Sequence, residues 1–331
     1  MIRILKLAAG FTISGVCLTL AFRRVPLDQL WSAATSIPPQ TLAIAFTLAS
    51  ITLFLRSLRW RILLAGRAPL NLWIAFRVNS AGQLGNVVLP ARMGDFYRAT
   101  NLGRAGFNTP FTLATVLVER VLDAGFLVFL AALILTGMES APAWLARGAR
   151  LVALAATVGL AAAVILPRLE SRIRGLCEKV IPKTWRGRVM DLLNEFLDGL
   201  RGFQHLARAG SFLALTAAIW SVDTAGIVIV ARGLGIAMPP VTAALLISAV
   251  ALASAVPAAP GNLGVYQLVA ISILGVAGIG REPALSLALV MQAMTLATLI
   301  VWGLTGFWSL AADDRSLPAL PISSETVRID R

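Results

Sequence analysis

Three ionisable residues interrupt an otherwise apolar stretch, Thr109–Gly137, and they are the clearest candidates for chemistry in the chain. They are Glu119, Arg120 and Asp123. A charged side chain at the centre of a membrane helix costs roughly 2.5–3.5 kcal/mol on insertion scales, so these three should face protein or water rather than lipid. Arg120 and Asp123 are three positions apart and are expected to pair along one helix face, which leaves Glu119 in need of another cation.

A further lone carboxylate, Asp223, also lies in an apolar stretch, and two arginines, Arg92 and Arg98, flank Asp95. We expect Glu119, Asp123 or Asp223 to reach these arginines across a helical bundle. Such a network either only holds the bundle together or also forms a polar path. Arginine can bind phosphate through two parallel hydrogen bonds. Arg92, Arg98 and Asp95 are therefore the candidate contacts for the anionic headgroup of a lipid.

A second basic cluster contains Arg56, Arg59 and Trp60. Basic residues beside a tryptophan are typical of the cytoplasmic membrane interface, where they anchor a helix end. The cluster is interpreted as an inner-interface anchor in preference to a ligand site.

Two stretches, Trp73–Pro90 and Val241–Gly261, are apolar but contain glycines and prolines. Each ends in or runs into the spacing P-x-x-x-G, followed directly by a polar residue. Helix-breaking backbone survives at membrane depth only where protein or water satisfies it, so both stretches are interpreted as re-entrant or broken. The residues expected to act as hinges are Pro90, Gly94, Pro257, Pro260, Gly261 and Asn262.

The elements that must position these residues are membrane helices. The chain of 331 residues is 58% hydrophobic and only 14% charged, which excludes an ordinary soluble fold. Seven stretches approach the roughly 20 residues that a transmembrane helix needs. They are Ile4–Phe22, Pro38–Leu55, Thr109–Gly137, Leu151–Leu166, Ser211–Ala231, Leu263–Ile279 and Ala284–Leu310. The first stretch is interpreted as a retained anchor, with a cleaved signal peptide as the alternative.

The net charge of +13 is interpreted as orientation rather than as nucleic-acid binding. With the N-terminus in the cytoplasm and the C-terminus outside, most Lys and Arg residues fall on the cytoplasmic side of an inner or plasma membrane. Two cysteines, Cys17 and Cys177, and one histidine, His205, cannot form a Cys/His metal cluster. The phosphate-binding pattern G-x-x-x-x-G-K-[ST] is absent, and no cofactor is expected.

The expected fold is an all-α polytopic bundle in a single membrane domain, residues 1–310, with a disordered tail at 311–331. The two broken stretches suggest an inverted repeat, about 38–166 and about 211–310, and this architecture is common in transporters. Coincidental hinges in a plain helical bundle are the alternative. The amphipathic cytoplasmic region 167–209 that joins the repeats either lies on the inner membrane surface or is a solvated linker.

Four motifs occur in order and carry a family resemblance: Arg56-x-x-Arg59-Trp60, Asn86-x-x-Leu-Pro90-x-Arg92-x-Gly94-Asp95-x-x-Arg98, Glu119-Arg120-x-x-Asp123 and Pro257-x-x-Pro260-Gly261-x-x-Gly264. They resemble the transmembrane region of the lysylphosphatidylglycerol synthase family over about residues 5–310. The resemblance implies a polytopic bundle that handles a lipid with an anionic headgroup. In full-length synthases this region is associated with lipid flipping, while a separate cytosolic domain transfers lysine. Asn262 and Gln267 depart from the expected family pattern.

The resemblance therefore favours a lipid translocase acting on an anionic phospholipid or a polyprenyl-phosphate lipid. Only about 20 residues follow the last expected span, so aminoacyl transfer by this chain is not expected. The alternatives are a membrane-embedded glycosyl- or acyl-transferase, and a scaffold within an envelope-lipid complex. The expected partners are membrane lipids and, in either alternative, envelope-lipid biosynthetic proteins, but no nucleic acid.

Overall fold

A computed structural model describes residues 37–65, 67–89, 92–104, 107–137, 206–254 and 260–312, together with scattered residues at 19, 35 and between 151 and 197. All regular structure in this part of the chain is helical, which confirms the expected all-α bundle. The expected spans Ile4–Phe22 and Leu151–Leu166, the linker 167–209 and the tail 311–331 lie wholly or mostly outside the described residues. So do the expected hinges Pro90 and Pro257.

The helices occur in the same order twice: a long helix, a pair of short helices, and a second long helix. The first unit contains α3 (Pro39–Leu64), α4 (Leu72–Val88), α5 (Met93–Arg104) and α6 (Thr109–Gly137). The second unit contains α10 (Leu206–Gly233), α11 (Pro240–Ala253), the short 3-10 helix η4 (Pro260–Asn262), α12 (Val265–Val276) and α13 (Arg281–Ala312).

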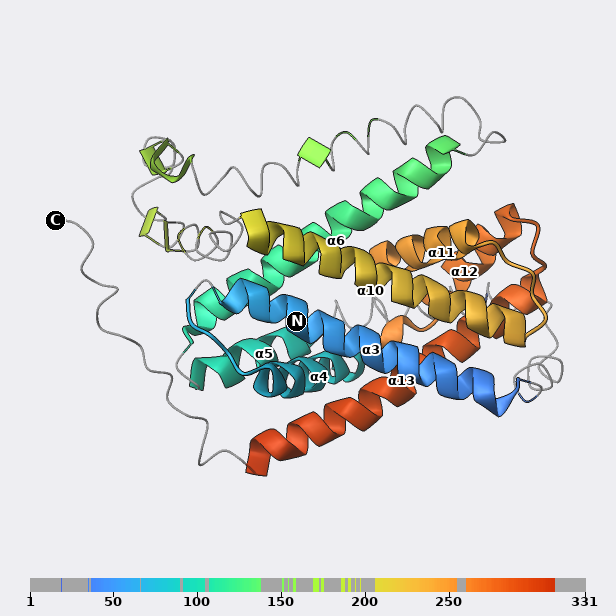
Figure 1. The fold of residues 1–331 in the computed structure, drawn as a ribbon, viewed down its shortest axis with the longest axis horizontal. Helices are drawn as coiled ribbons and strands as arrows, with labels where there is room; N and C mark the ends of the chain where they lie inside the picture. The colour runs from blue at the N-terminus through green and yellow to red at the C-terminus, as the bar shows by residue number, and fades with distance from the viewer. Residues whose placement is uncertain are drawn as a thin grey trace.

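The long helices that open the two units, α3 and α10, run in opposite directions. Near one end of the bundle Gly233 on α10 packs against Thr41 on α3. Near the other end Arg59 on α3 donates to Thr216 on α10. The first helices of the two units are therefore antiparallel, as Figure 1 shows by the opposite progress of their colours along the long axis. Antiparallel first helices are what the expected inverted repeat requires.

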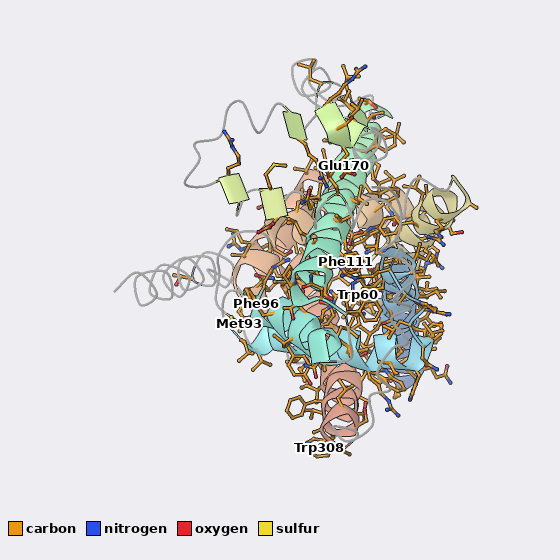
Figure 2. All side chains as sticks on the ribbon, turned by 90° about the vertical axis from the view of Figure 1, so that its left-hand side faces the viewer. Trp60, Met93, Phe96, Phe111, Glu170 and Trp308 are labelled. Atoms are coloured by element: carbon orange, nitrogen blue, oxygen red, sulfur yellow. The ribbon has the colours of Figure 1, made fainter. Side chains whose placement is uncertain are left out.

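Three described helices are long and apolar enough to cross a membrane: α3, the Ala207–Gly233 part of α10, and α13. They correspond to the expected spans that begin at Pro38, Ser211 and Ala284. Another expected span, Thr109–Gly137, forms the 29-residue α6. The Trp308 side chain of α13 points away from the bundle (Figure 2), as expected for a surface in contact with lipid.

The paired short helices cannot cross the hydrocarbon core individually. At 1.5 Å per residue α4 extends about 25 Å, α11 about 21 Å, and α5 and α12 each about 18 Å, against a core of about 30 Å. The members of each pair pack against each other. We therefore describe α4–α5 as the first hairpin and α11–α12 as the second hairpin.

The expected span Leu263–Ile279 is wrong, because its only helix is the 12-residue α12. The helix stops at a C-terminal motif built on Gly278, which has a φ of +76°. The Ile279 N–H donates to the Leu274 carbonyl at 2.9 Å, and the Gly278 N–H donates to Gly275 at 3.1 Å. Such a motif ends a helix whatever the hydropathy of the residues that follow it.

The first hairpin is held together by glycine contacts. A Cβ atom on Gly94 of α5 would overlap the Gly82 carbonyl and the Asn86 amide of α4, and a Cβ on Gly85 would approach Gly94 at 3.0 Å. Small residues allow membrane helices to approach at backbone distance. Gly94 was expected to be a hinge, but it lies within a regular helix and acts as a packing contact.

Candidate functional site

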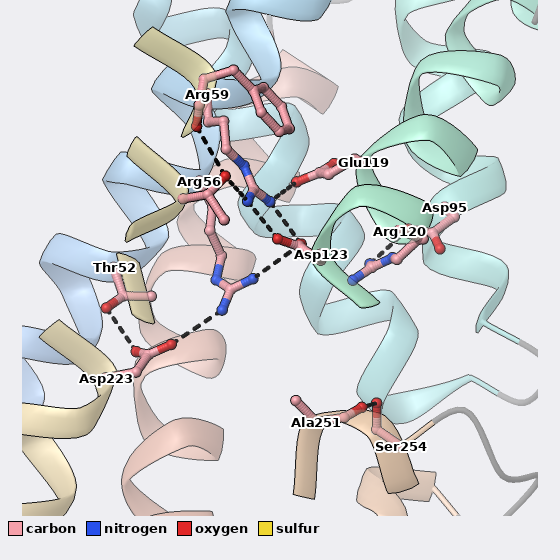
Figure 3. Close-up of polar contacts among 12 residues, drawn as sticks. Thr52, Arg56, Arg59, Asp95, Glu119, Arg120, Asp123, Asp223, Ala251 and Ser254 are labelled. Atoms are coloured by element: carbon pink, nitrogen blue, oxygen red, sulfur yellow. Dashed lines mark hydrogen bonds and ion pairs between the residues drawn. The ribbon is translucent and has the colours of Figure 1, made fainter. Parts of the chain in front are cut away.

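The centre of the first unit contains an ion pair between α3 and α6. Arg59 Nη1 and Nη2 lie 2.5 Å and 2.7 Å from the two carboxylate oxygens of Asp123 (Figure 3). Arg59 also donates to Glu119 Oε1 at 3.1 Å and to Thr216 Oγ1 at 3.0 Å. The Arg59 side chain is fully buried, and each of these groups reduces the cost of that burial.

Glu119 carries the network onward to α5. Its second oxygen accepts from Arg98 Nη2 at 3.0 Å, and Arg98 Nη1 lies 3.6 Å from Asp95 Oδ1. Arg120 donates to the same Asp95 oxygen at 3.3 Å. Asn86 on α4 donates to the Asp95 carboxylate at 2.9 Å and accepts from the Asp95 backbone N–H at 3.0 Å, so Asp95 joins both helices of the first hairpin.

Arg56 carries the network in the other direction, from α3 to α10. It donates to Asp223 Oδ2 at 3.1 Å and lies 3.9 Å from Asp123 Oδ2 (Figure 3). Thr52 donates to the other oxygen of Asp223 at 2.8 Å. The alternating charges therefore extend without a break from Asp95 on α5, through α6 and α3, to Asp223 on α10.

Aromatic rings cover the faces of three network arginines. The Arg98 guanidinium lies 4.0 Å from the ring centre of Trp60, Arg59 lies 5.0 Å from Phe212, and Arg56 lies 4.9 Å from Trp220. A guanidinium that binds carboxylates along its edge and an aromatic ring on its face is held in one orientation.

The burial of Arg59 and Trp60 does not fit the inner-interface anchor expected from the sequence. Both side chains are 0% exposed, and the Trp60 indole N–H donates to Thr115 Oγ1 at 3.2 Å. Arg56 is likewise part of the network rather than of a loop. These residues lie within α3, which extends nine residues beyond the expected end at Leu55.

The pairing expected among the network charges is partly confirmed. The expected contact between Glu119 and an arginine across the bundle is confirmed for Arg98. The expected pairing of Arg120 with Asp123 is wrong, because Arg120 turns to Asp95 while the planar fork of Arg59 holds both oxygens of Asp123. Asp223 pairs with Arg56 rather than with Arg92 or Arg98.

The tips of the two hairpins meet at Arg92. Its Nη2 donates to both the carbonyl and the hydroxyl oxygen of Ser254, each at 3.0 Å, across 162 positions of sequence. Ser254 is the C-terminal cap of α11, and Arg92 directly precedes α5. Further along the chain, after the undescribed residues 255–259, Gly261 lies next to Val87 of α4.

Arg92 is also the surplus cation of this region. The described network holds four arginines and four carboxylates, which balance one another: Arg56, Arg59, Arg98 and Arg120 with Asp95, Glu119, Asp123 and Asp223. Among the described residues no carboxylate lies within ion-pair distance of Arg92. The meeting point of the tips therefore carries an uncompensated positive charge, which suits an anion.

The tip of the second hairpin is fixed by two glutamines that sequence reasoning did not bring together. Gln267 accepts from the Gly264 N–H at 2.7 Å and donates to Gln292, which in turn donates to the Gly261 carbonyl at 2.6 Å. Gly261 and Asn262 have φ values of +72° and +54°. A lone amide in the apolar α13 sequence was the available signal for Gln292, whereas nothing in the sequence singled out Ser254.

The expected hinge positions around η4 are thus only partly described. Pro260 opens η4, Gly261 and Asn262 supply its left-handed backbone, and the glutamine pair satisfies the polar backbone atoms that this conformation leaves free. Within the described residues there is no group of three His, Cys, Asp or Glu side chains placed to hold a metal ion. This arrangement supports electrostatic binding of an anion at Arg92, next to a buried network whose positive and negative charges balance.

Comparison with known proteins places these features in a family. The family model described as the lysylphosphatidylglycerol synthase TM region matches residues 7–303. Glycosyltransferase AglD of Haloferax volcanii is 24% identical over 351 aligned residues, which cover 93% of this chain. The chain spans only about half the length of that relative, 55%. No solved structure matches the chain significantly.

Proposed function

The chain belongs to the family of the lysylphosphatidylglycerol synthase transmembrane region and is a membrane protein of that type, and from this premise we propose that it is a lipid translocase. Its substrate is a lipid with an anionic headgroup, either a phospholipid or a polyprenyl phosphate. The positive charge bias of the expected cytoplasmic side supports an inner or plasma membrane with the N-terminus in the cytoplasm.

The observation that carries the proposal is the contact between the tips of two hairpins, one from each half of the expected inverted repeat. Neither arm of either hairpin is long enough to cross the core, and the tips contact each other through Arg92 and Ser254. Transporters built from inverted repeats bind substrate at the repeat interface and expose it to each side in turn. The hairpin tips are the part of this fold that corresponds to such an interface.

The charge at the tips favours an anionic substrate. Arg92 is only partly buried and lacks a carboxylate partner among the described residues, so its guanidinium suits a phosphate. Arg98 and Asp95 were also expected to contact the headgroup. Since Arg98 is fully buried and paired with Glu119, we assign Arg98 and Asp95 to positioning the first hairpin and Arg92 to the headgroup itself.

The network of Glu119, Arg120, Asp123 and Asp223 was expected to form an interior polar path. In this proposal it is the rigid frame against which the second hairpin moves, because all its charges are compensated. A balanced network costs less inside a membrane than isolated charges do and holds α3, α5, α6 and α10 in one arrangement.

A second candidate function is glycosyl transfer to a membrane lipid, favoured by the similarity to the glycosyltransferase of Haloferax volcanii. One experiment separates the two. The purified full chain is reconstituted into liposomes carrying fluorescent phosphatidylglycerol, and the fraction of probe accessible to a quencher outside the vesicles is followed over time. Faster loss of the protected fraction than in protein-free liposomes supports translocation. No difference in that rate, combined with turnover of a radiolabelled nucleotide sugar, supports the transferase and contradicts the translocase.

A further inference from the structure

The contact between Arg92 and Ser254 is made to groups that carry no net charge. Both acceptors belong to Ser254: its carbonyl oxygen and its hydroxyl oxygen. The hydroxyl is shared, since it also donates to the Ala251 carbonyl at 2.6 Å. The carbonyl lies at the C-terminal end of α11, where the helix dipole presents partial negative charge to Arg92. A full anion offers a guanidinium a stronger partner than these groups do.

The backbone at Arg92 is in an unfavourable conformation. Its φ of +53° lies in the left-handed region, which crowds the Cβ atom of a residue other than glycine. Asn262 in the second hairpin has a φ of +54°, but asparagine tolerates this region better than arginine does. A strained residue persists only when its surroundings hold it in place, and for Arg92 the visible side-chain restraint is Ser254.

We infer that the Arg92–Ser254 contact is a latch between the hairpin tips, and that a phosphate-bearing ligand with a net negative charge opens it by competition. The phosphate takes over the Arg92 N–H groups that bind Ser254. The backbone strain at Arg92 favours the release of Arg92 from Ser254. The two tips then separate while the balanced network keeps the long helices in place. This inference rests on the proposed function. In it, the opening of the latch couples headgroup binding to the separation of the hairpin tips.

The latch predicts a distance change that can be measured. Cys17 and Cys177 are first replaced by serine, and spin labels are attached to cysteines at Val88, the exposed end of α4, and Leu263, which follows η4. In nanodiscs of phosphatidylcholine we expect one short distance population. Nanodiscs containing phosphatidylglycerol should add a second, longer population. A label pair at Ile51 on α3 and Leu213 on α10 should keep one distance in both lipids, because the network fixes these helices.

Variants decide whether Arg92 is the latch. Arg92→Gln should show the longer population in phosphatidylcholine already and should not respond to phosphatidylglycerol. Arg92→Lys keeps the charge without the fork and should still respond. Identical distance distributions for the wild type and Arg92→Gln in phosphatidylcholine overturn the latch, whether or not the protein moves lipid. A latch that opens in a protein that moves no lipid instead overturns only the proposed function.

Inorganic phosphate, added to protein in phosphatidylcholine nanodiscs, separates the sources of the ligand. If only phosphatidylglycerol lengthens the distance, the latch responds to a lipid headgroup. If inorganic phosphate alone also lengthens the distance, the latch stands and its ligand is any accessible phosphate that carries a net negative charge. If neither addition changes the distance, the latch is contradicted.

Discussion

Arg59 and Asp123 form a two-pronged ion pair, with N–O distances of 2.5 Å and 2.7 Å, that joins α3 to α6 at the centre of the first unit. Arg59 is 0% exposed and Asp123 6%. Because Arg59 also holds Glu119, and Arg56 also approaches Asp123, the pair lies at the centre of the whole alternating network. The stability of the bundle should depend on it more than on any charge outside the network.

Removing one partner of this pair should therefore destabilise the protein strongly. We expect Asp123→Leu to lower the free energy of unfolding by about 3–5 kcal/mol, because it leaves Arg59 buried with only part of its compensation. The measurement is denaturant-induced or thermal unfolding of the full chain in detergent. Arg232→Gln provides the control, since Arg232 is exposed at the end of α10 and its loss should change the free energy by less than about 0.5 kcal/mol.

The double variant Arg59→Met with Asp123→Leu tests whether the pair acts as a unit. Its cost should be smaller than the sum of the two single variants, because it leaves neither of the two charges without the other. Additive costs would show that the two side chains act independently, contrary to the geometry.

Two glycines that look alike in the sequence should respond in opposite directions to alanine. A Cβ on Gly94 would overlap backbone atoms of Gly82 and Asn86, so Gly94→Ala should separate α4 from α5 and cost about 1–3 kcal/mol. A Cβ on Gly226, within α10, would meet no atom within 4 Å. Gly226→Ala should be neutral or stabilise by up to about 1 kcal/mol, because alanine is the better helix former.

The unfolding midpoints of the two variants in the same detergent are the measurement. Equal midpoints for Gly94→Ala and Gly226→Ala would contradict the close packing of the first hairpin and restore the interpretation of Gly94 as a free hinge.

The glutamine pair should control local opening of the second hairpin. Gln292→Leu leaves the Gly261 carbonyl and the Gln267 amide without their partners, at about 1–3 kcal/mol for each buried group. We expect faster amide hydrogen exchange in the peptide that covers residues 260–268 and little change in α10. Thr295→Ala, on an exposed position one turn further along α13, should leave exchange in that peptide unchanged. Unaltered exchange in Gln292→Leu would show that the pair does not hold the tip.

Much of the helical framework was predictable from the sequence because apolar length and polar breaks determine it. The bounds of α6 coincide with the expected stretch Thr109–Gly137, and those of α10 and α13 differ from expectation by a few residues. The two stretches interpreted as re-entrant or broken contain α4 and α11, the first arms of the two hairpins, whereas the second arms α5 and α12 were not expected as short helices. Hydropathy did not show that α12 ends at Val276, because the end depends on the conformation of Gly278 rather than on polarity.

The partners of the charges were not predictable, because they come from distant parts of the chain. Arg56 and Arg59 followed an apolar run and so read as the start of a cytoplasmic loop. In the structure carboxylates of α6 and α10 compensate them, which allows α3 to continue to Leu64. The sequence shows which residues are charged, but only the fold shows which carboxylate compensates which arginine. Only the structure distinguishes Arg98, which is paired with a carboxylate, from Arg92, which has no carboxylate partner among the described residues.

The most direct test of the account is the rate at which Arg92 variants move phosphatidylglycerol and phosphatidylcholine in reconstituted liposomes. We predict that wild-type protein moves phosphatidylglycerol faster than phosphatidylcholine, that Arg92→Gln abolishes this preference, and that Arg232→Gln retains it. The account is contradicted if Arg92→Gln, folded and incorporated to the same extent, moves phosphatidylglycerol at the wild-type rate.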